Sequence, residues 1–271
     1  MEITERKLQE LLESLDDELY PELCTCLVDW RDSLDSEWPV QKPYFYATQL
    51  QVCDAREELP EQIGDLVKSI YLQEIRRENA EAMLNLGALY YTGRAGEQNY
   101  KKAVQYYTMA ADRGNAQAVE NLGYCWYYGR TGTVDYEKAF HCFVKGALAG
   151  RITSRYKMGD LYRYGYYVEK DEKLAAHIYQ KCYNELGLCG SADNCADVCM
   201  RMGDVYYYGI GESRDLKAAL RYYQESERYF YTKIAGGDYF APQGLQKVLR
   251  QQARARDRLR HDLPSFDWAN K

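Results

Sequence analysis

The stretch AEAMLNLGALYYTGRAGEQNYKKAVQYYTMAADRGN, residues 80–115, decides the fold, because its spacing of small and aromatic residues returns three more times along the chain. In each copy a glycine is followed after three residues by an aromatic residue and after three more by a second glycine. Six residues later comes Asn or Asp, and four after that an alanine. The four copies are Gly87, Tyr90, Gly93, Asn99, Ala103; Gly123, Trp126, Gly129, Asp135, Ala139; Gly159, Tyr162, Gly165, Asp171, Ala175; and Gly203, Tyr206, Gly209, Asp215, Ala219. Successive first glycines are 36, 36 and 44 residues apart. A fixed period of this length is typical of stacked repeats, in which each unit buries its apolar face against its neighbours.

Each copy predicts a pair of helices. In the first copy Ala82, Leu86 and Leu89 recur with the spacing of an amphipathic helix. The second glycine stands where a left-handed residue would end that helix, and the Asn or Asp stands where a side-chain acceptor would cap the next one. The first glycine lies inside a helix, where it costs roughly 1 kcal/mol relative to alanine. We therefore predict that the two helices approach closely at this glycine, with the alanine of the second helix opposite it.

These units resemble the Sel1-like repeat, a relative of the tetratricopeptide repeat with the approximate pattern A-x3-LG-x2-Y-x2-G-x5-D-x3-A. In the first unit Ala82, Leu86, Gly87, Tyr90 and Gly93 fall in register with that pattern, and the resemblance covers about residues 80–235. The third and fourth units depart from it at four positions that remain small or apolar: Ser154, Met158, Val198 and Met202. The resemblance implies an all-α, right-handed solenoid of helical hairpins, with units that start near residues 80, 116, 152 and 196.

The remaining chain flanks this array. Residues 1–65 form an acidic region with helical patterns at 4–19, 21–35 and about 44–59, and WPVQKP at 38–43 is the clearest linker. Residues 66–79 align with the end of a unit and predict the lone second helix of a degenerate repeat. Residues 236–271 predict a C-terminal capping helix and tail, since a terminal repeat needs a polar outer face. The surplus of the third interval lies at 184–199, where NELGLCGSADNCADVC predicts a longer loop.

Composition narrows the class of protein. The chain has 271 residues with 46% hydrophobic content, which excludes wholesale disorder. Residues 1–79 hold 19 acidic against 8 basic side chains, and residues 80–271 hold 22 against 27, so the charge is strongly uneven. No run of eighteen apolar residues occurs, and the charged N-terminus lacks the apolar core of a signal peptide. Nine cysteines at irregular spacings fit buried free thiols. We therefore expect a cytoplasmic protein with no membrane or nucleic-acid partner and no cofactor.

The resemblance also points to a binding surface. In tetratricopeptide geometry four positions of each first helix line the concave face, and these positions carry tyrosines with interspersed carboxylates. This pattern predicts a non-enzymatic scaffold or adaptor that binds a protein or peptide partner, and the carboxylates favour a basic segment. Many of the 28 tyrosines are also suited to packing between helices. The candidate binding residues are Glu81, Leu84, Tyr91, Gln117, Glu120, Tyr124, Tyr127, Tyr156, Asp160, Arg163, Asp197, Met200, Asp204 and Tyr207.

Catalysis has little support in the sequence. Ser154 and Lys157 match the S-x-x-K of serine acylases, but Ser154 occupies a small-residue packing position, and neither S-D-N nor K-T-G follows. The three histidines are scattered and form no metalloprotease motif. We predict no catalytic residues.

Two further clusters leave alternatives open. Cys182, Cys189, Cys195 and Cys199 fall within the insertion and could be free thiols, a disulfide or zinc ligands. The alternative function is therefore a metal-binding or enzyme-accessory module centred on residues 182–199. The arginines of the C-terminal segment could contact phosphates, but a solvated capping helix explains them better: Arg250, Arg254, Arg256, Arg258 and Arg260.

Overall fold

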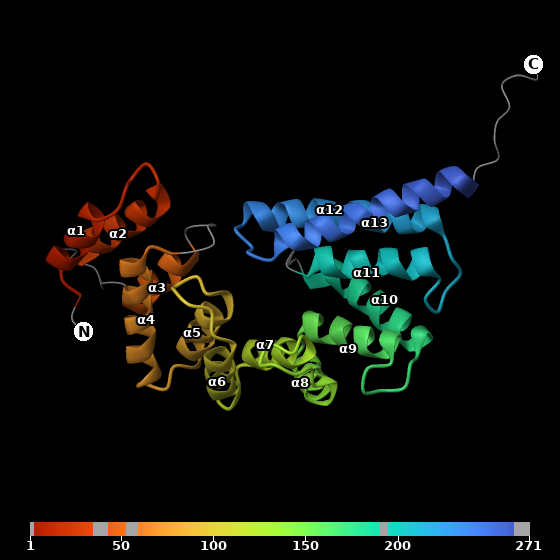
Figure 1. Cartoon of the computed structure of the whole chain (residues 1–271), viewed down its shortest axis with the longest axis horizontal. Coiled ribbons are helices and arrows are strands. Elements are labelled where there is room, and N and C mark those ends of the chain that lie inside the picture. The colour runs from red at the N-terminus through yellow and green to blue at the C-terminus, as the bar shows by residue number, and fades with distance from the viewer. Residues whose placement is uncertain (1–2, 35–42, 53–58, 190–193, 263–271) are drawn as a thin grey trace, which may run out of the picture. The chain divides into compact units, whose positions relative to one another are not determined.

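The computed structural model describes residues 3–34, 43–52, 59–189 and 194–262, with the side chains of 187–189 and 262 outside the described set. All regular structure in these residues is helical, which confirms the predicted all-α class (Figure 1). The chain forms two compact units, residues 1–135 and 136–271, which we describe separately. The predicted linker at 38–43 lies outside the described residues except for Pro43. None of the described helices is long and apolar enough to cross a lipid bilayer.

The first unit contains seven described helices. They are α1 (Glu5–Glu13), α2 (Pro21–Leu34), α3 (Pro43–Val52), α4 (Glu61–Ile75), α5 (Ala80–Thr92), α6 (Tyr100–Ala111) and α7 (Ala116–Tyr127). Their core includes Leu27, Trp30, Ile63 and Leu86, all fully buried, and Trp30 stacks on Tyr46 with ring centroids 5.0 Å apart. Helix α4 begins five residues earlier than the predicted half-repeat. Its packing shows that the acidic region and the first repeat share one core.

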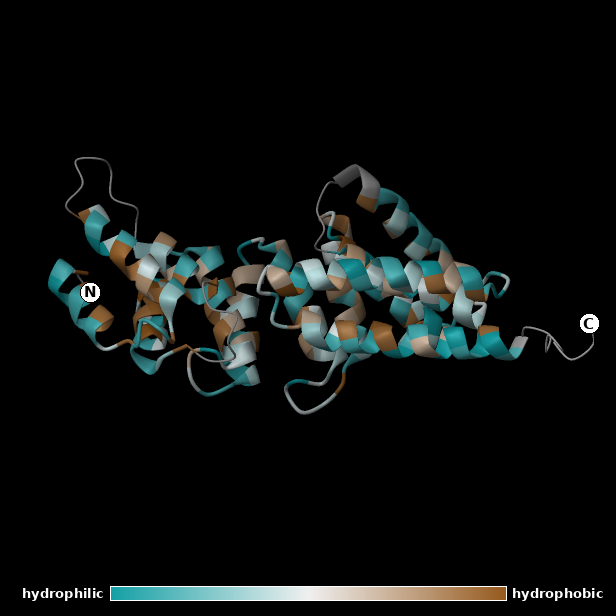
Figure 2. Ribbon diagram, turned by 90° about the horizontal axis from the view of Figure 1, so that it is seen from above, coloured by the Kyte–Doolittle hydropathy of each residue, from teal (hydrophilic) through white to brown (hydrophobic). Residues whose placement is uncertain are grey.

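The second unit contains six described helices. They are α8 (Tyr136–Leu148), α9 (Ile152–Tyr164), α10 (Glu172–Cys189), α11 (Cys195–Tyr208), α12 (Leu216–Ala235) and α13 (Ala241–Asp262). Figure 2 shows α13, the helix that leads to the C-terminus, as largely hydrophilic along its length. This matches the predicted capping helix, whose buried side includes Val248 and Ala255.

The sequence predicts a loop at the insertion, residues 184–199, but most of this segment is helical in the structure. Helix α10 continues to Cys189, and only residues 190–194 separate it from α11. Cys182 and Leu186 are buried in the core of this unit, and Glu185 pairs with Arg155 of α9. The surplus residues therefore lengthen a packed helix, because tertiary contacts outweigh the local preference of glycine for a turn. Of the glycines that suggested a loop, Gly190 lies outside the described residues.

The repeat markers act as predicted at the helix ends. Gly93 ends α5 with φ +78°, a left-handed conformation, and Gly165 and Gly209 end α9 and α11 in the same way. Asn99 caps α6 by accepting a hydrogen bond from the Lys102 amide at 3.0 Å. Asp171 and Asp215 cap the second helices of later units similarly.

The mid-helix glycines make room for tyrosine rings rather than for the alanines we expected. A methyl group on Gly87 would lie 2.7 Å from the ring of Tyr107, and one on Gly159 would lie 2.6 Å from the ring of Tyr179. Gly203 bears the same relation to Tyr223. The predicted close approach is present at these three positions, but an aromatic side chain four residues beyond the alanine fills the space.

Candidate functional site

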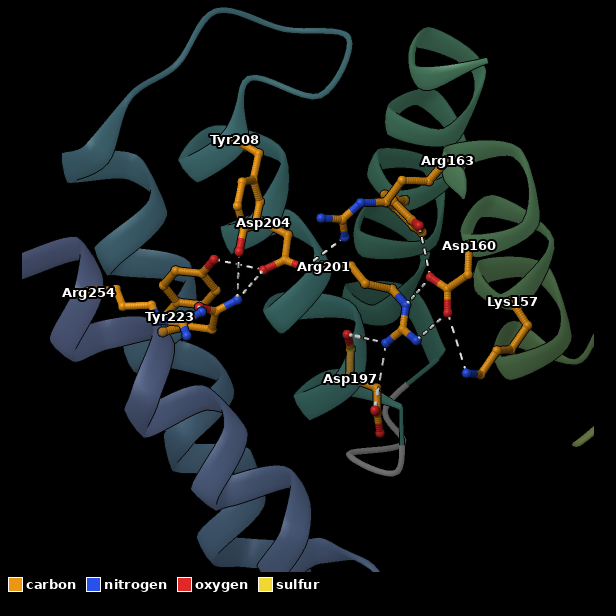
Figure 3. Close-up of polar contacts among 11 residues, drawn as sticks. Lys157, Asp160, Arg163, Asp197, Arg201, Asp204, Tyr208, Tyr223 and Arg254 are labelled. Atoms are coloured by element: carbon orange, nitrogen blue, oxygen red, sulfur yellow. Dashed lines mark hydrogen bonds and ion pairs between the residues drawn. The ribbon is translucent and has the colours of Figure 1, made fainter. Parts of the chain in front are cut away.

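Two buried ion pairs join the first helices of successive repeats in the second unit (Figure 3). Arg201 of α11 donates from Nε and Nη2 to the two carboxylate oxygens of Asp160 in α9, at 2.8 and 2.7 Å. In the opposite sense, Arg163 of α9 donates from Nη1 to Asp204 of α11 at 2.7 Å. The four side chains are 9–11% exposed. We call these four residues the ion-pair ladder.

A tyrosine from the second helix of each unit donates a further hydrogen bond to each carboxylate. Tyr179 of α10 donates its hydroxyl to Asp160 at 2.8 Å, and Tyr223 of α12 donates to Asp204 at 2.7 Å. Both tyrosines stand 19 residues after their aspartate, so the same contact recurs in two units. These are also the rings that fill the space beside the repeat glycines. Each carboxylate therefore links two helices of its own unit to the first helix of the neighbouring unit.

The ladder holds its groups in the charged form. Burial opposes ionisation of Asp160, but Arg201, Lys157 and the hydrogen bonds from Arg201 and Tyr179 outweigh it and hold the pKa of this carboxyl below its usual range. Burial likewise disfavours the charged Arg201, yet Asp160 raises the pKa of its guanidinium. Lys157 Nζ lies 3.4 Å from Asp160 and is itself buried. Through Asp160 this paired network connects α9 with both α10 and α11.

The S-x-x-K sequence belongs to this packing. Ser154 is fully buried and faces Gly146 of α8, where a methyl group would collide with it. Lys157 is a further cation that pairs with Asp160 of the ladder. These positions agree with the interpretation of Ser154 as a small packing residue.

The predicted binding stripe is less exposed than the sequence suggested. Glu81 and Gln117 are exposed, and Tyr91, Tyr124, Tyr127, Arg163 and Asp197 are partly buried. Seven of the candidates are buried within the chain, which corrects the expectation of an open stripe: Leu84, Glu120, Tyr156, Asp160, Met200, Asp204 and Tyr207. The physical reason is that side chains of neighbouring helices cover these positions, as the ladder does at Asp160 and Asp204.

Three partly buried candidates of the first unit, Tyr91, Tyr124 and Tyr127, belong to one group of side chains with Arg130. Its guanidinium lies 5.7, 5.3 and 5.5 Å from the ring centroids of Tyr91, Tyr100 and Tyr128, and its Nε donates to the Tyr91 hydroxyl at 3.1 Å. Tyr124 stacks on Tyr128 at 6.0 Å, and Tyr127 meets the same ring edge-on at 4.9 Å. Tyr128 is 49% exposed. The Arg130 cluster comprises Tyr91, Tyr100, Tyr124, Tyr127, Tyr128 and Arg130.

The second unit also has exposed tyrosine rings packed against an arginine. Tyr164 ends α9 and Tyr208 ends α11, and each is 48% exposed. The Arg163 guanidinium lies 5.0 Å from the Tyr164 ring centroid and 5.4 Å from that of Tyr208. One arginine thus serves the buried ladder and also supports two surface rings.

Comparison with known proteins identifies the repeat. The family model described as Sel1 repeat matches residues 80–115, 116–150, 152–184 and 196–227, half of the chain. The chain belongs to the Sel1 repeat family. The resemblance inferred from the sequence is therefore confirmed, and so is the α-solenoid class. Sel1 repeat proteins are generally protein-interaction scaffolds.

Solved structures agree on the Sel1 fold. A Sel1 repeat protein from Oxalobacter formigenes is similar with a TM-score of 0.51 and 22% identity, over 76% of this chain and 84% of that one. The protective antigen c5321 of uropathogenic Escherichia coli, which displays an SLR fold, has a TM-score of 0.52 and 20% identity, over 93% of this chain and 56% of that one. This chain thus spans little more than half of that antigen. A search of curated proteins found no match.

The sequence interpretation missed the exposed rings of these Sel1 repeats. Tyr128, Tyr164 and Tyr208 share one repeat position, the fifth after the first glycine, and Thr92 occupies it in the first unit. The predicted stripe used the fourth position instead. The repeat period could have predicted these exposed rings, because a residue directly before the helix-ending glycine lies in the last turn of its helix.

The cysteines of the Sel1 insertion lie in the core where they are described. Cys182, Cys195 and Cys199 are buried thiols, and burial raises the pKa of Cys182 to about 12. The side chain of Cys189 is outside the described set. Among the residues described, no three His, Cys, Asp or Glu side chains gather as metal ligands would. The metal-binding alternative stays a prediction, which zinc analysis of the purified protein tests.

Proposed function

We propose that this protein is a non-enzymatic scaffold of the cytoplasm that binds a protein or peptide partner through the Arg130 cluster. The observation that carries the proposal is the grouping of three tyrosine rings around the exposed Arg130, with two further rings packed against one of the three, Tyr128. Tyrosine and arginine dominate binding energy at protein interfaces, because they bring large contact area and hydrogen-bonding groups. Mutual stacking restricts these rings before a partner arrives, which lowers the entropy lost on binding.

A basic partner segment is not part of this proposal. Three of the five carboxylates that suggested it are paired with cations of the chain itself: Asp160 with Arg201, Asp204 with Arg163, and Asp197 with Lys233 at 3.8 Å. Glu120 is buried, which leaves Glu81 as the exposed carboxylate of the stripe. A carboxylate that is already neutralised by a buried arginine adds little attraction for a cation outside.

The test is affinity capture with the full chain, identification of the captured protein, and measurement of its binding in purified form. Tyr124→Ala plus Tyr127→Ala should weaken binding by about tenfold or more, because each removes a ring from the cluster. Tyr231→Ala, at an exposed tyrosine on α12 outside the cluster, is the control and should leave binding unchanged. Circular dichroism checks that each variant is folded. Equal binding by the double variant and the wild type, with both folded, would refute the Arg130 cluster as the site.

A further inference from the structure

We propose that the second unit carries a separate surface for an acidic segment of a protein partner. The surface consists of one flank of α13 together with Tyr164 and Tyr208 at the ends of α9 and α11. It does not depend on the Arg130 cluster, and the test below separates the two.

The flank of α13 is a row of exposed cations. Lys247, Arg250, Arg254 and Arg258 follow one another at intervals of three, four and four residues, so they lie on one side of the helix. We call these four residues the basic flank. Arg250 Nε donates to the carbonyl oxygen of Gln246 on the same helix at 3.3 Å. Within residues 194–262 and the other described ranges, no carboxylate forms an ion pair with any of the four cations, so their charge is available to a partner.

The basic flank lies beside α11. Gln251, next to Arg250 and Arg254 on the helix surface, donates from Nε2 to the Tyr208 hydroxyl at 3.3 Å and to Asp204 at 3.4 Å. The Arg258 guanidinium lies 4.7 Å from the ring centroid of Tyr207. Figure 3 shows Arg254 beside the group formed by Asp204, Tyr208 and Tyr223. The cations and the exposed Tyr208 ring therefore form one continuous surface.

This surface is positive because the carboxylates beneath it are already matched. Asp160 and Asp204 are buried against Arg201 and Arg163. Asp257 is the exposed carboxylate nearest the flank on α13, and it faces His261 at 3.8 Å. Among the described side chains of α13, Asp257 is thus the one carboxylate beside the four cations of the basic flank.

An acidic protein segment suits this arrangement. The flank rises about 16 Å from Lys247 to Arg258 at 1.5 Å per residue, the length of about five extended residues. Carboxylates of such a segment could pair with the planar guanidinium groups, and its apolar side chains could pack on Tyr164 and Tyr208. Phosphates would also be attracted, but the net charge of −6 repels a nucleic acid, with one charge on every nucleotide, more than a short acidic segment that also carries apolar side chains.

The test measures fluorescence anisotropy of a rhodamine-labelled peptide of alternating Glu and Phe with the full chain, beside an alternating Lys and Phe peptide. The acidic peptide should bind, and its affinity should fall as salt rises. Arg250→Glu plus Arg254→Glu should weaken it by about tenfold or more. Arg256→Glu plus Arg260→Glu makes the same change of net charge on the other side of α13 and should alter binding by less than about twofold.

Three results would overturn the proposal. The first is no preference for the acidic peptide over the basic one, and the second is an equal loss in both double variants. The third is tighter binding of an oligothymidylate than of the acidic peptide, with the same sensitivity to Arg250 and Arg254, which would assign the surface to nucleic acid. Tyr124→Ala plus Tyr127→Ala should leave peptide binding unchanged, so failure here is distinguishable from failure at the Arg130 cluster.

Discussion

Removing Arg201 should destabilise the second unit more than removing any surface cation. The substitution Arg201→Met keeps most of the side-chain volume but deletes both hydrogen bonds to Asp160, at 2.8 and 2.7 Å. Breaking one side of a buried ion pair typically costs about 3–5 kcal/mol, because an uncompensated charge is left in the interior. Asp160 retains Lys157 at 3.4 Å and the Tyr179 hydroxyl at 2.8 Å, so we expect the lower end, about 3 kcal/mol.

Urea denaturation at pH 7, followed by circular dichroism, measures this loss. With a slope of about 3 kcal/mol per molar urea, the midpoint of the second unit should fall by about 1 M. The control is Lys170→Met, which removes an exposed pair with Glu172 at 2.7 Å and should change the free energy of unfolding by less than about 0.5 kcal/mol.

A double variant separates pairing from packing. In Asp160→Asn plus Arg201→Met the amide can still accept from Tyr179, and no unpaired carboxylate is left at position 160. Lys157 loses its ion pair with Asp160 here just as in Asp160→Asn alone, so that loss cancels in the comparison. Its loss should therefore be smaller than the sum of the two single losses by about 1 kcal/mol or more. If Arg201→Met is as mild as the Lys170 control, or if the two losses simply add, then the ladder does not hold α9 against α11.

Three further outcomes follow from the same contacts. The pKa of Asp160 is lower in the folded than in the unfolded chain, so ionised Asp160 stabilises the fold. This contribution to the free energy of unfolding should be complete above about pH 5 and shrink as pH falls below about 4. The urea midpoints of wild type and Asp160→Asn should therefore converge as the pH is lowered through this range. Gly159→Ala should lower the free energy of unfolding by about 1–2 kcal/mol, because the methyl group meets the Tyr179 ring, whereas Gly236→Ala has ordinary contacts and should be nearly neutral in the same assay. Cys182 should resist alkylation by iodoacetamide at pH 8 in the folded protein and react after denaturation, since burial raises its pKa to about 12; rapid labelling in the folded state, located by mass spectrometry, would contradict this.

The helix pairs could be predicted because their signals are local. Gly93 ends α5 and Asn99 caps α6 through atoms only a few residues away, so the sequence spacing contains the whole interaction. The extension of α10 to Cys189 could not be predicted in the same way. Its glycines favour a turn locally, and the burial of Leu186 against other helices reverses that preference.

The ladder was hidden for a different reason. Asp160 and Arg201 are 41 residues apart, as are Arg163 and Asp204. The equivalent positions in the first two units carry Ala88 and Tyr124, so the repeat frame alone gives no charge at the position after the glycine. The charges were therefore assigned to a binding surface. To predict the two ion pairs, one must know the repeat period and also that the first helices of successive repeats pack against each other.

The ladder connects the architecture of the repeat to its surface. Arg163 donates a hydrogen bond to Asp204, and its guanidinium also lies against the exposed rings of Tyr164 and Tyr208. The contact that holds α9 against α11 therefore also positions these two rings. A buried ion pair adds little net stability compared with a pair of apolar side chains of similar volume. Its better-attested effect is to favour a single register between the packed helices. For a scaffold, a fixed register matters because a partner that spans two repeats must find its anchor residues at a constant distance. The arginine at position 163 should therefore influence binding even by a partner that never touches it.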